Sequence, residues 1–114
     1  MIHFSYSGQF ATLNSKYISR RFVLSDNYRG AKEELGFRAR EIMRGRAPVS
    51  GQLWCDIDFK YKGREPDIDA YIKFILDSMN DIVYQDDKQI RRLTVTKTKG
   101  KENLAKISLD TYIY

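Results

Sequence analysis

Apolar and polar residues alternate with a period of two in several parts of this 114-residue chain. Residues 2–7 alternate in this way, as do residues 53–61 ("LWCDIDFKY") and the C-terminal segments 90–97 and 103–114. Such alternation is typical of strands with one buried face, so we predict strands at these places. Residues 17–25 ("YISRRFVLS") are rich in β-branched and aromatic side chains and predict a short strand or one arm of a hairpin.

Two other segments repeat their apolar residues every three or four positions, which is the period of an amphipathic helix. The first runs from about Asp26 to Arg44, and its predicted buried stripe consists of Tyr28, Ala31, Leu35, Ala39 and Ile42. The second runs from Asp67 to about Met79, and the residues predicted to face the core are Ile68, Ile72, Ile75 and Met79. Ser25 is a suitable N-cap for the first helix, and Asn80 is a suitable left-handed cap after the second.

The order of these elements predicts an α+β fold, a mostly antiparallel sheet with two main helices packed on it. A chain of 114 residues with 42% hydrophobic content can bury one core and is too short for two, so we expect a single domain. No apolar run approaches the roughly 20 residues that span a bilayer, and residues 1–10 lack the features of a secretory signal. The lone Cys55 excludes an internal disulfide. We therefore expect a soluble cytoplasmic protein with no membrane partner.

The chain is basic, with 20 Lys and Arg residues against 15 Asp and Glu residues and a pI near 9.3. This balance favours a polyanionic partner, and nucleic acid is preferred because the sequence contains no strongly basic amphipathic anchor for a membrane. Within this basic chain, one short segment gathers the aspartates Asp67, Asp69, Asp77, Asp81, Asp86 and Asp87. Neighbouring carboxylates repel one another unless a cation compensates them, so the cluster requires a physical reason.

Asp67 and Asp69 have two interpretations. Acidic residues at the start of a helix interact favourably with its macrodipole, which explains one of them fully and the second less well. Asp69, Lys73 and Asp77 are spaced by four and would share one side of the helix. Ion pairs at this spacing are usually solvated and weak, so this arrangement alone favours an ordinary surface.

Asp86 and Asp87 follow a short apolar segment, residues 81–84 ("DIVY"), which would return them past the helix start if it pairs with the sheet. Adjacent carboxylates at this position have no evident helix-capping benefit, which favours convergence of the two acidic groups on a cation. Oxygen ligands without His or Cys favour Mg²⁺ or Mn²⁺. Such a site assists phosphoryl transfer, and Lys73 would stabilise the phosphate charge or orient the attacking water. A basic protein with this acidic pocket is interpreted as a nuclease.

Residues 66–90 ("PDIDAYIKFILDSMNDIVYQDDKQI") resemble the RusA family of Holliday junction resolvases. The shared pattern is an Asp-x-Asp pair that opens a helix, a Lys one turn later, an Asp a further turn on, and Asp-Asp-x-Gln after an aromatic residue. A looser similarity extends over nearly the whole chain and includes residues 13–17 ("LNSKY"). The resemblance implies that residues 1–114 form a single RusA-like endonuclease domain, of a family commonly encoded by phages and prophages.

By this resemblance the protein is a crossover junction endodeoxyribonuclease of DNA recombination and repair. It would act as a homodimer with Mg²⁺ or Mn²⁺ and place symmetric nicks across four-way junction DNA. The implied site consists of the catalytic metal-binding carboxylates Asp67, Asp69 and Asp87, the catalytic Lys73 and the assisting metal ligand Asp86. A homodimer also agrees with the substrate's near two-fold symmetry, because a chain with one site needs a partner to cut two strands.

The expected DNA contacts are basic or polar residues near this site, namely Asn14, Lys16, Arg20, Arg21 and Arg64. Further basic candidates are Arg29, Arg40, Arg44, Arg46, Lys97, Lys99 and Lys101. The sequence departs from the family pattern at Ala70, where Asn is common, and at Glu65-Pro66, where basic residues often precede the first Asp.

Two other functions match parts of the pattern. The first is a restriction-type nuclease with a Pro-Asp and Asp-x-Lys motif, in which Lys88 replaces Lys73 as the catalytic lysine. Because a helical period follows Asp67 directly, the β-hairpin that this motif requires is disfavoured.

The second is a small phage-type DNA-binding protein without catalytic activity, whose acids only cap a helix and form ion pairs. Asp56 and Asp58 are expected on the solvent-facing side of a strand.

Overall fold

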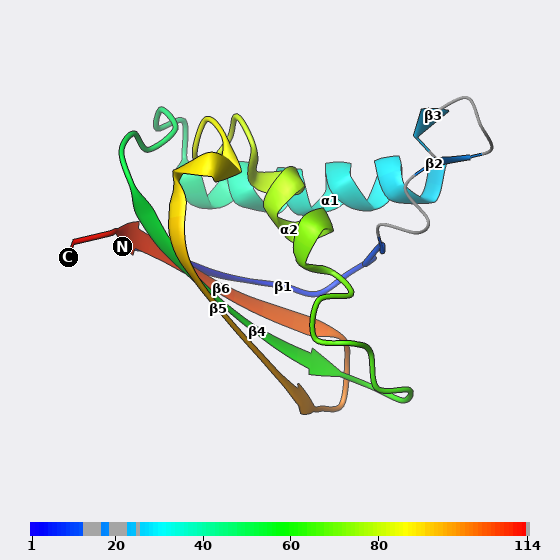
Figure 1. Ribbon diagram of the computed structural model, residues 1–114. Helices are drawn as coiled ribbons and strands as arrows, with labels where there is room; N and C mark the ends of the chain where they lie inside the picture. The colour runs from blue at the N-terminus through cyan, green and yellow to red at the C-terminus, as the bar shows by residue number, and fades with distance from the viewer. Residues whose placement is uncertain (13–16, 19–22, 25, 114) are drawn as a thin grey trace.

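The computed structural model describes residues 1–12, 17–18, 23–24 and 26–113. Within these residues, two helices cover one face of a four-stranded sheet (Figure 1). The sheet contains β1 (Ile2–Tyr6), β4 (Leu53–Tyr61), β5 (Ile90–Lys99) and β6 (Leu104–Thr111), and the helices are α1 (Asp26–Met43) and α2 (Ile72–Met79). A separate short hairpin contains β2 (Tyr17–Ile18) and β3 (Val23–Leu24), and a 3₁₀ turn, η3 (Asp87–Gln89), precedes β5. The predicted α+β class is confirmed.

The strand order is β1-β6-β4-β5, so the last strand of the chain lies in the interior of the sheet. β6 pairs antiparallel with both β1 and β4, whereas β4 and β5 are parallel and joined through α2. The two C-terminal strands follow one another along the chain but do not pair with each other. In the connection between β5 and β6, Gly100 N donates to Tyr61 O at 2.8 Å. This hydrogen bond joins the connection to the last residue of β4.

The core lies between the sheet and the helices. Alternate residues of β4 are buried, and the buried Cys55, Ile57 and Phe59 each have a buried neighbour on β6, as in the pair Ile57 and Ile107. From α1, the fully buried residues are Tyr28, Ala31, Leu35 and Ala39, which confirms most of the predicted stripe. Asp56 and Asp58 lie on the opposite face of β4, as expected, but both are half-buried and not fully exposed to solvent, and Thr96 donates to Asp58 at 2.9 Å.

The second helix is shorter than predicted, because it begins at Ile72 and not at Asp67. Asp67 to Tyr71 form turns, with hydrogen bonds from Ala70 N to Asp67 O (3.0 Å) and from Ile72 N to Asp69 O (3.3 Å). Ile68 was predicted to face the core but is 49% exposed. At the end of these turns, the ring of Tyr71 packs against those of Phe10 and Phe59.

The end of α2 also differs from the prediction. Asn80 has φ −59° and ψ 136°, so it is extended and not left-handed. The left-handed residue is Asp81, with φ 65°, and aspartate tolerates this conformation better than most residues. The following segment does not join the sheet. Instead, Val49 N donates to Val83 O at 2.8 Å, and Val49 forms an isolated bridge with Tyr84.

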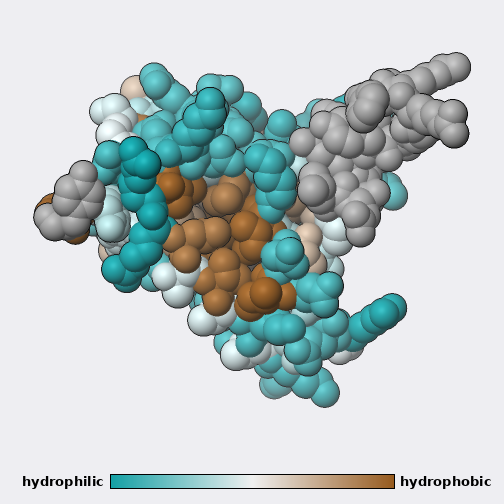
Figure 2. Space-filling model, in the orientation of Figure 1, coloured by the Kyte–Doolittle hydropathy of each residue, from teal (hydrophilic) through white to brown (hydrophobic). Residues whose placement is uncertain are grey.

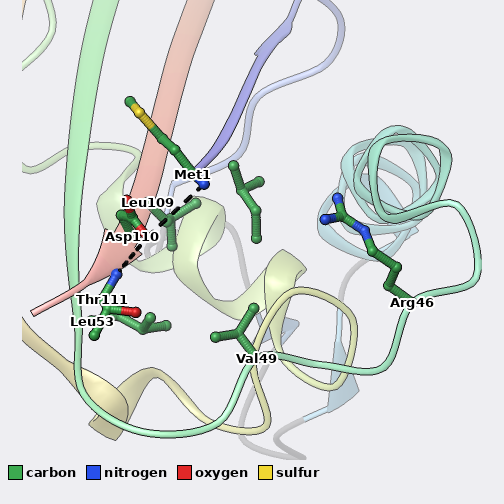
Figure 3. Close-up of a pocket in the computed structure, with 8 residues that line it drawn as sticks. Met1, Arg46, Val49, Leu53, Leu109, Asp110 and Thr111 are labelled. Carbon is green, nitrogen blue, oxygen red and sulfur yellow. Dashed lines mark hydrogen bonds and ion pairs between the residues drawn. The ribbon is translucent and has the colours of Figure 1, made fainter.

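Apolar side chains gather on the surface between α2 and β5 (Figure 2). A narrow groove there is lined by residues of β4, β5, α2 and the preceding turn, and it includes the exposed Ile68. At the other end of the sheet, a cavity of about 130 Å³ lies near the N-terminus, where the Met1 amino group is 4.0 Å from Asp110 (Figure 3). Within the described part of the chain, no helix is long and apolar enough to cross a bilayer.

Candidate active site

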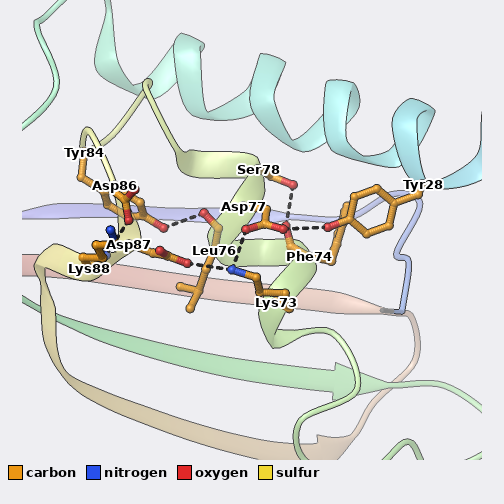
Figure 4. A network of polar contacts seen from close by, with 10 residues as sticks. All are labelled: Tyr28, Lys73, Phe74, Leu76, Asp77, Ser78, Tyr84, Asp86, Asp87 and Lys88. Carbon is orange, nitrogen blue, oxygen red and sulfur yellow. Dashed lines mark hydrogen bonds and ion pairs between the residues drawn. The ribbon is translucent and has the colours of Figure 1, made fainter. Parts of the chain in front are cut away.

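Lys73 connects the two acidic segments that the sequence analysis singled out. Its ammonium group lies 3.0 Å from Asp77 Oδ1, one turn further along α2, and 3.3 Å from Asp87 Oδ2 in η3 (Figure 4). The segment after α2 therefore does return past the start of the helix, as expected, although it does so without pairing to the sheet. Residues 14 positions apart in sequence thereby share one hydrogen-bond network.

Asp77 is buried, with only 8% of its surface exposed, and is not a solvated surface residue. Its second oxygen accepts a hydrogen bond from the hydroxyl of Tyr28 at 3.1 Å, and Tyr28 comes from α1. A buried carboxylate is costly unless partners compensate it. The hydroxyl of Tyr28 and the ammonium group of Lys73 provide that compensation from two different elements, so each oxygen of Asp77 has a partner.

Asp67 and Asp69 are exposed in the turn before α2. They line a hollow of about 550 Å³ together with Lys73, Thr12 and residues of the first turns of α2. Neither acid lies in the first turn of the helix, so the helix-macrodipole interpretation does not apply to them. The structure therefore places both aspartates and the predicted catalytic lysine around one surface depression.

Lys97 of β5 holds the turn that carries Asp67. Its ammonium group lies 2.7 Å from Glu65 and donates to the carbonyl oxygen of Pro66 at 2.8 Å. Tyr61 donates to the same Glu65 carboxylate at 3.2 Å. The hydrogen bond that Lys97 donates to Glu65 is the largest cause both of the lowered pKa of Glu65 and of the raised pKa of Lys97. The departure from the family pattern at Glu65-Pro66 thus has a structural role here.

Asp86 has a local role that the sequence analysis missed. It is the N-cap of η3, where its side chain accepts from Lys88 N at 2.9 Å, and the side chain of Gln89 accepts from Asp86 N at 3.1 Å. This is a capping box, so the expectation that adjacent acids have no capping benefit at this position was wrong. The hydrogen bond from the Lys88 backbone is also the largest cause of the lowered pKa of Asp86.

The residue types fit Mg²⁺ or Mn²⁺, because Asp67, Asp69 and Asp87 offer only carboxylate oxygens. A single chain does not gather them into a preformed centre. Among the residues that the structure describes, no three His, Cys, Asp or Glu side chains are grouped so that they could hold a metal ion. What the chain does bring together is Lys73 with Asp87, and Lys73 with the hollow that Asp67 and Asp69 line.

The model of the endodeoxyribonuclease RusA family matches residues 8–110. The chain belongs to the RusA endodeoxyribonuclease family. The match spans both acidic segments, Lys73 and all strands of the sheet except β1 and the last residue of β6. Among curated proteins, none matches the sequence. Family membership makes this protein an endonuclease of DNA, and it confirms the resemblance inferred from residues 66–90.

The predicted DNA contacts of this RusA-family chain are distributed unevenly. Asn14, Lys16, Arg20 and Arg21 lie outside the described residues. Arg64 is exposed in the turn that leads to Asp67. Two of the further candidates have structural partners: Lys97 holds Glu65, and the guanidinium group of Arg46 donates to Ile42 O and Met43 O at the end of α1. Arg29, Arg40 and Arg44 are exposed on α1 or at its end.

The sequence analysis did not assign Asp77 or Tyr28 to the site of this RusA-family enzyme. Asp77 had a signal, because it lies four residues after Lys73 on the same helix. Tyr28 had none beyond its place in the apolar stripe of α1, where an aromatic residue is normally a core residue. Only the packing of α1 against α2 shows that its hydroxyl reaches Asp77.

Proposed function

We propose that this RusA-family protein is a metal-dependent Holliday junction resolvase that makes paired, symmetric nicks across four-way junction DNA. The observation that carries the proposal is the position of Lys73. Its ammonium group joins Asp87 to α2 at the hollow lined by Asp67 and Asp69. An ammonium group beside carboxylates that would hold a divalent ion suits a phosphodiester, whose transition state carries extra negative charge on the phosphoryl oxygens.

Lys73 would act as a cation and not as a base. Hydrogen bonding to Asp77 is the largest cause of the rise in its pKa above the ordinary lysine value, so it stays protonated at neutral pH. A protonated ammonium group donates hydrogen bonds to phosphoryl oxygens and stabilises the charge that develops there. The exposed half of its side chain leaves it accessible to a phosphate in the hollow.

Asp67, Asp69 and Asp87 would hold Mg²⁺ or Mn²⁺, with Asp86 assisting. When bound, the ion supplies Lewis-acid stabilisation of the phosphoryl group and lowers the pKa of a bound water. Because one chain does not gather these carboxylates into a centre, the proposal requires that they approach one another in the assembled enzyme. The role of Asp86 as the cap of η3 would keep the neighbouring Asp87 directed toward Lys73.

A homodimer would supply the second cut. A four-way junction has near two-fold symmetry, and two related subunits place two equivalent sites on opposite strands. The basic balance of the chain, +5 overall, supports binding to the polyanionic substrate.

The restriction-type alternative has less support. Asp86 and Asp87 lie at a 3₁₀ turn and Asp67 in a turn before a helix, so they do not form the β-hairpin that this motif requires. Lys88 is exposed, and its backbone amide, not its ammonium group, contacts Asp86.

The test is cleavage of a synthetic mobile four-way junction, a plain duplex and a flap, each with Mg²⁺, with Mn²⁺ and with EDTA. The proposal predicts paired nicks on the junction alone, only with metal, and predicts that Lys73→Ala abolishes them while Lys88→Ala retains them. Equal cutting of plain duplex, with loss in Lys88→Ala, would favour the restriction-type mechanism. Junction binding without cleavage under either metal would contradict the proposal.

A further inference from the structure

Asp77 is a carboxylate with two committed oxygens in a buried position. Oδ1 faces Lys73 at 3.0 Å, and Oδ2 accepts from the Tyr28 hydroxyl at 3.1 Å (Figure 4). The two partners differ in their surroundings, since Tyr28 is completely buried whereas half of the Lys73 side chain is exposed. Asp77 therefore connects a buried residue of α1 to the ammonium group of Lys73 at the surface.

The rigidity of Tyr28 comes from its packing. Its ring meets that of Phe74 edge to face, with the ring centres 5.8 Å apart, and Phe74 is itself fully buried in α2. Close packing in a protein core restricts the rotamers of an aromatic ring, so the core restrains the position of the hydroxyl. Through that hydroxyl, the core fixes which way the Asp77 carboxylate is turned.

The ammonium group needs such a constraint. A lysine side chain has four rotatable bonds and loses considerable entropy when it is held in one place. Asp87 alone, at 3.3 Å and on a different segment, leaves other positions of the ammonium group open. With Asp77 as a second and shorter contact, the group is held between two carboxylates at a fixed place beside the hollow.

We infer that Asp77 and Tyr28 are positioning residues, which hold the Lys73 ammonium group where it meets the phosphate. This inference rests on the proposed function of Lys73. Neither residue touches the substrate in this account. The Tyr28 hydroxyl orients the Asp77 carboxylate, and the carboxylate holds the Lys73 ammonium group. The packing between the two helices thereby determines the position of the ammonium group.

The chain contains a matched control for Tyr28. Tyr84 is also completely buried, and its hydroxyl also donates to α2, to the carbonyl oxygen of Leu76 at 2.7 Å. Tyr28→Phe and Tyr84→Phe each remove one buried hydroxyl that is hydrogen-bonded to the same helix. Of the two, only Tyr28→Phe releases a contact of Asp77.

The experiment compares wild type, Tyr28→Phe and Tyr84→Phe by junction cleavage and by NMR of the Lys73 side-chain nitrogen without metal or DNA. The NMR signal is assigned by its absence in Lys73→Arg.

We expect Tyr28→Phe to lower kcat by about ten- to a hundredfold, the order expected when a reacting group is misplaced. Its KM should change by less than about twofold, because the lost contact orients a group and does not bind DNA. Relaxation of the Lys73 nitrogen should show a more mobile ammonium group. Tyr84→Phe should match wild type in kcat and in the NMR signal.

Asp77→Asn serves as a second variant, with circular dichroism as the check that it folds. It keeps the size of the side chain but removes the charge that holds Lys73, so the loss of kcat and the gain in mobility should equal or exceed those of Tyr28→Phe. Equal losses in Tyr28→Phe and Tyr84→Phe would overturn the inference, since they would show a merely structural effect. Unchanged Lys73 mobility in both Tyr28→Phe and Asp77→Asn would also overturn it. If wild type cleaves no junction, the proposed function fails, and the NMR comparison still decides whether Tyr28 and Asp77 position Lys73.

Discussion

Single residues of the acidic segment differ mainly in burial. Asp77 is buried and has partners on two helices, whereas Asp86 is exposed but caps η3 with its side chain. Asp67 and Asp69 are exposed and line the same hollow as Lys73. The free-energy cost of burying a charge explains this difference in burial. A buried carboxylate needs permanent partners, whereas an exposed one can exchange water for a ligand. The exposed pair is therefore the part of the cluster best suited to a metal ion.

Replacing Asp69 by Asn should abolish cleavage while junction affinity stays the same or rises. The amide is a weaker metal ligand than the carboxylate, and its neutrality removes a repulsive charge beside the phosphate. Cleavage of a labelled junction and an electrophoretic binding assay give the two quantities. Asp81→Asn is the matched control, since Asp81 is exposed and left-handed, a conformation that Asn also tolerates. Loss of cleavage and binding together in Asp69→Asn would count against the role given to this residue.

Cys55 provides a test at neutral and alkaline pH. The thiol is fully buried, and this burial, followed by the charge of Asp56, raises its pKa from 9.0 to about 12. The unfolded chain therefore loses this proton first, so the contribution of the neutral thiol to stability is present below pH 9 and declines between pH 9 and about 12. Urea unfolding of wild type and Cys55→Ala should show a difference that shrinks over this range. At pH 8, iodoacetamide should modify folded wild type far more slowly than the urea-unfolded protein, and equal rates would contradict the burial.

At the scale of elements, the period of the sequence predicted the regular segments well. β4 runs from Leu53 to Tyr61 as expected, and α1 from Asp26 to Met43. The predicted start of α2 was wrong because the apolar residues Ile68 and Ile72 have helical spacing. The conformation of the chain before Ile72 is instead determined by tertiary contacts. These are the packing of the Tyr71 ring on Phe59 and the ion pair of Lys97 with Glu65. Contacts between distant segments have no periodic signal, so sequence could not reveal them.

The same limit applies to the candidate site. The spacing of Lys73 and Asp77 along one helix made their pair foreseeable, and the contact of Lys73 with Asp87 followed from the expectation that the acidic segments converge. The contact between Tyr28 and Asp77 spans 49 positions and depends on how α1 packs on α2. Similarly, the parallel pairing of β4 and β5 depends on the crossover through α2, which strand patterns do not encode.

Two glycines test the contribution of local backbone geometry, with opposite expected signs. Gly36 lies within α1, where an added Cβ would meet Ile82 Cδ1 at 3.4 Å and Ser78 O at 3.6 Å, which are ordinary contacts. Gly36→Ala should raise the free energy of unfolding by about 0.5 kcal/mol, because alanine loses less entropy in a helix.

Gly63 has φ +80° and open space around it, so Gly63→Ala should lower that free energy by about 1 kcal/mol through backbone strain alone. Urea denaturation measures both, and destabilisation by Gly36→Ala would show that the helices cannot tolerate the added methyl group.

For the whole molecule, the distribution of charge matters more than its total. The chain carries a net charge of +5, yet six of its 15 acidic residues, all of them aspartates, lie between Asp67 and Asp87. Arg29, Lys32 and Arg40 line a separate hollow of about 480 Å³, which the acidic residues Glu33 and Asp81 also line. A basic protein with a local excess of carboxylates can attract DNA and, at a separate place, bind a divalent cation. This separation is the physical basis of the proposed nuclease.

The central claim is that carboxylates from two separate segments share one ion beside Lys73. Titration of the metal-free protein with Mn²⁺, followed by electron paramagnetic resonance, tests it without reference to cleavage. We predict that wild type and the Asp81→Asn control bind Mn²⁺ at the same site, and that Asp69→Asn and Asp87→Asn each weaken this binding by at least about tenfold, as loss of a charged ligand should. If both variants bind Mn²⁺ as tightly as wild type, the two segments do not hold a common ion and the account is contradicted.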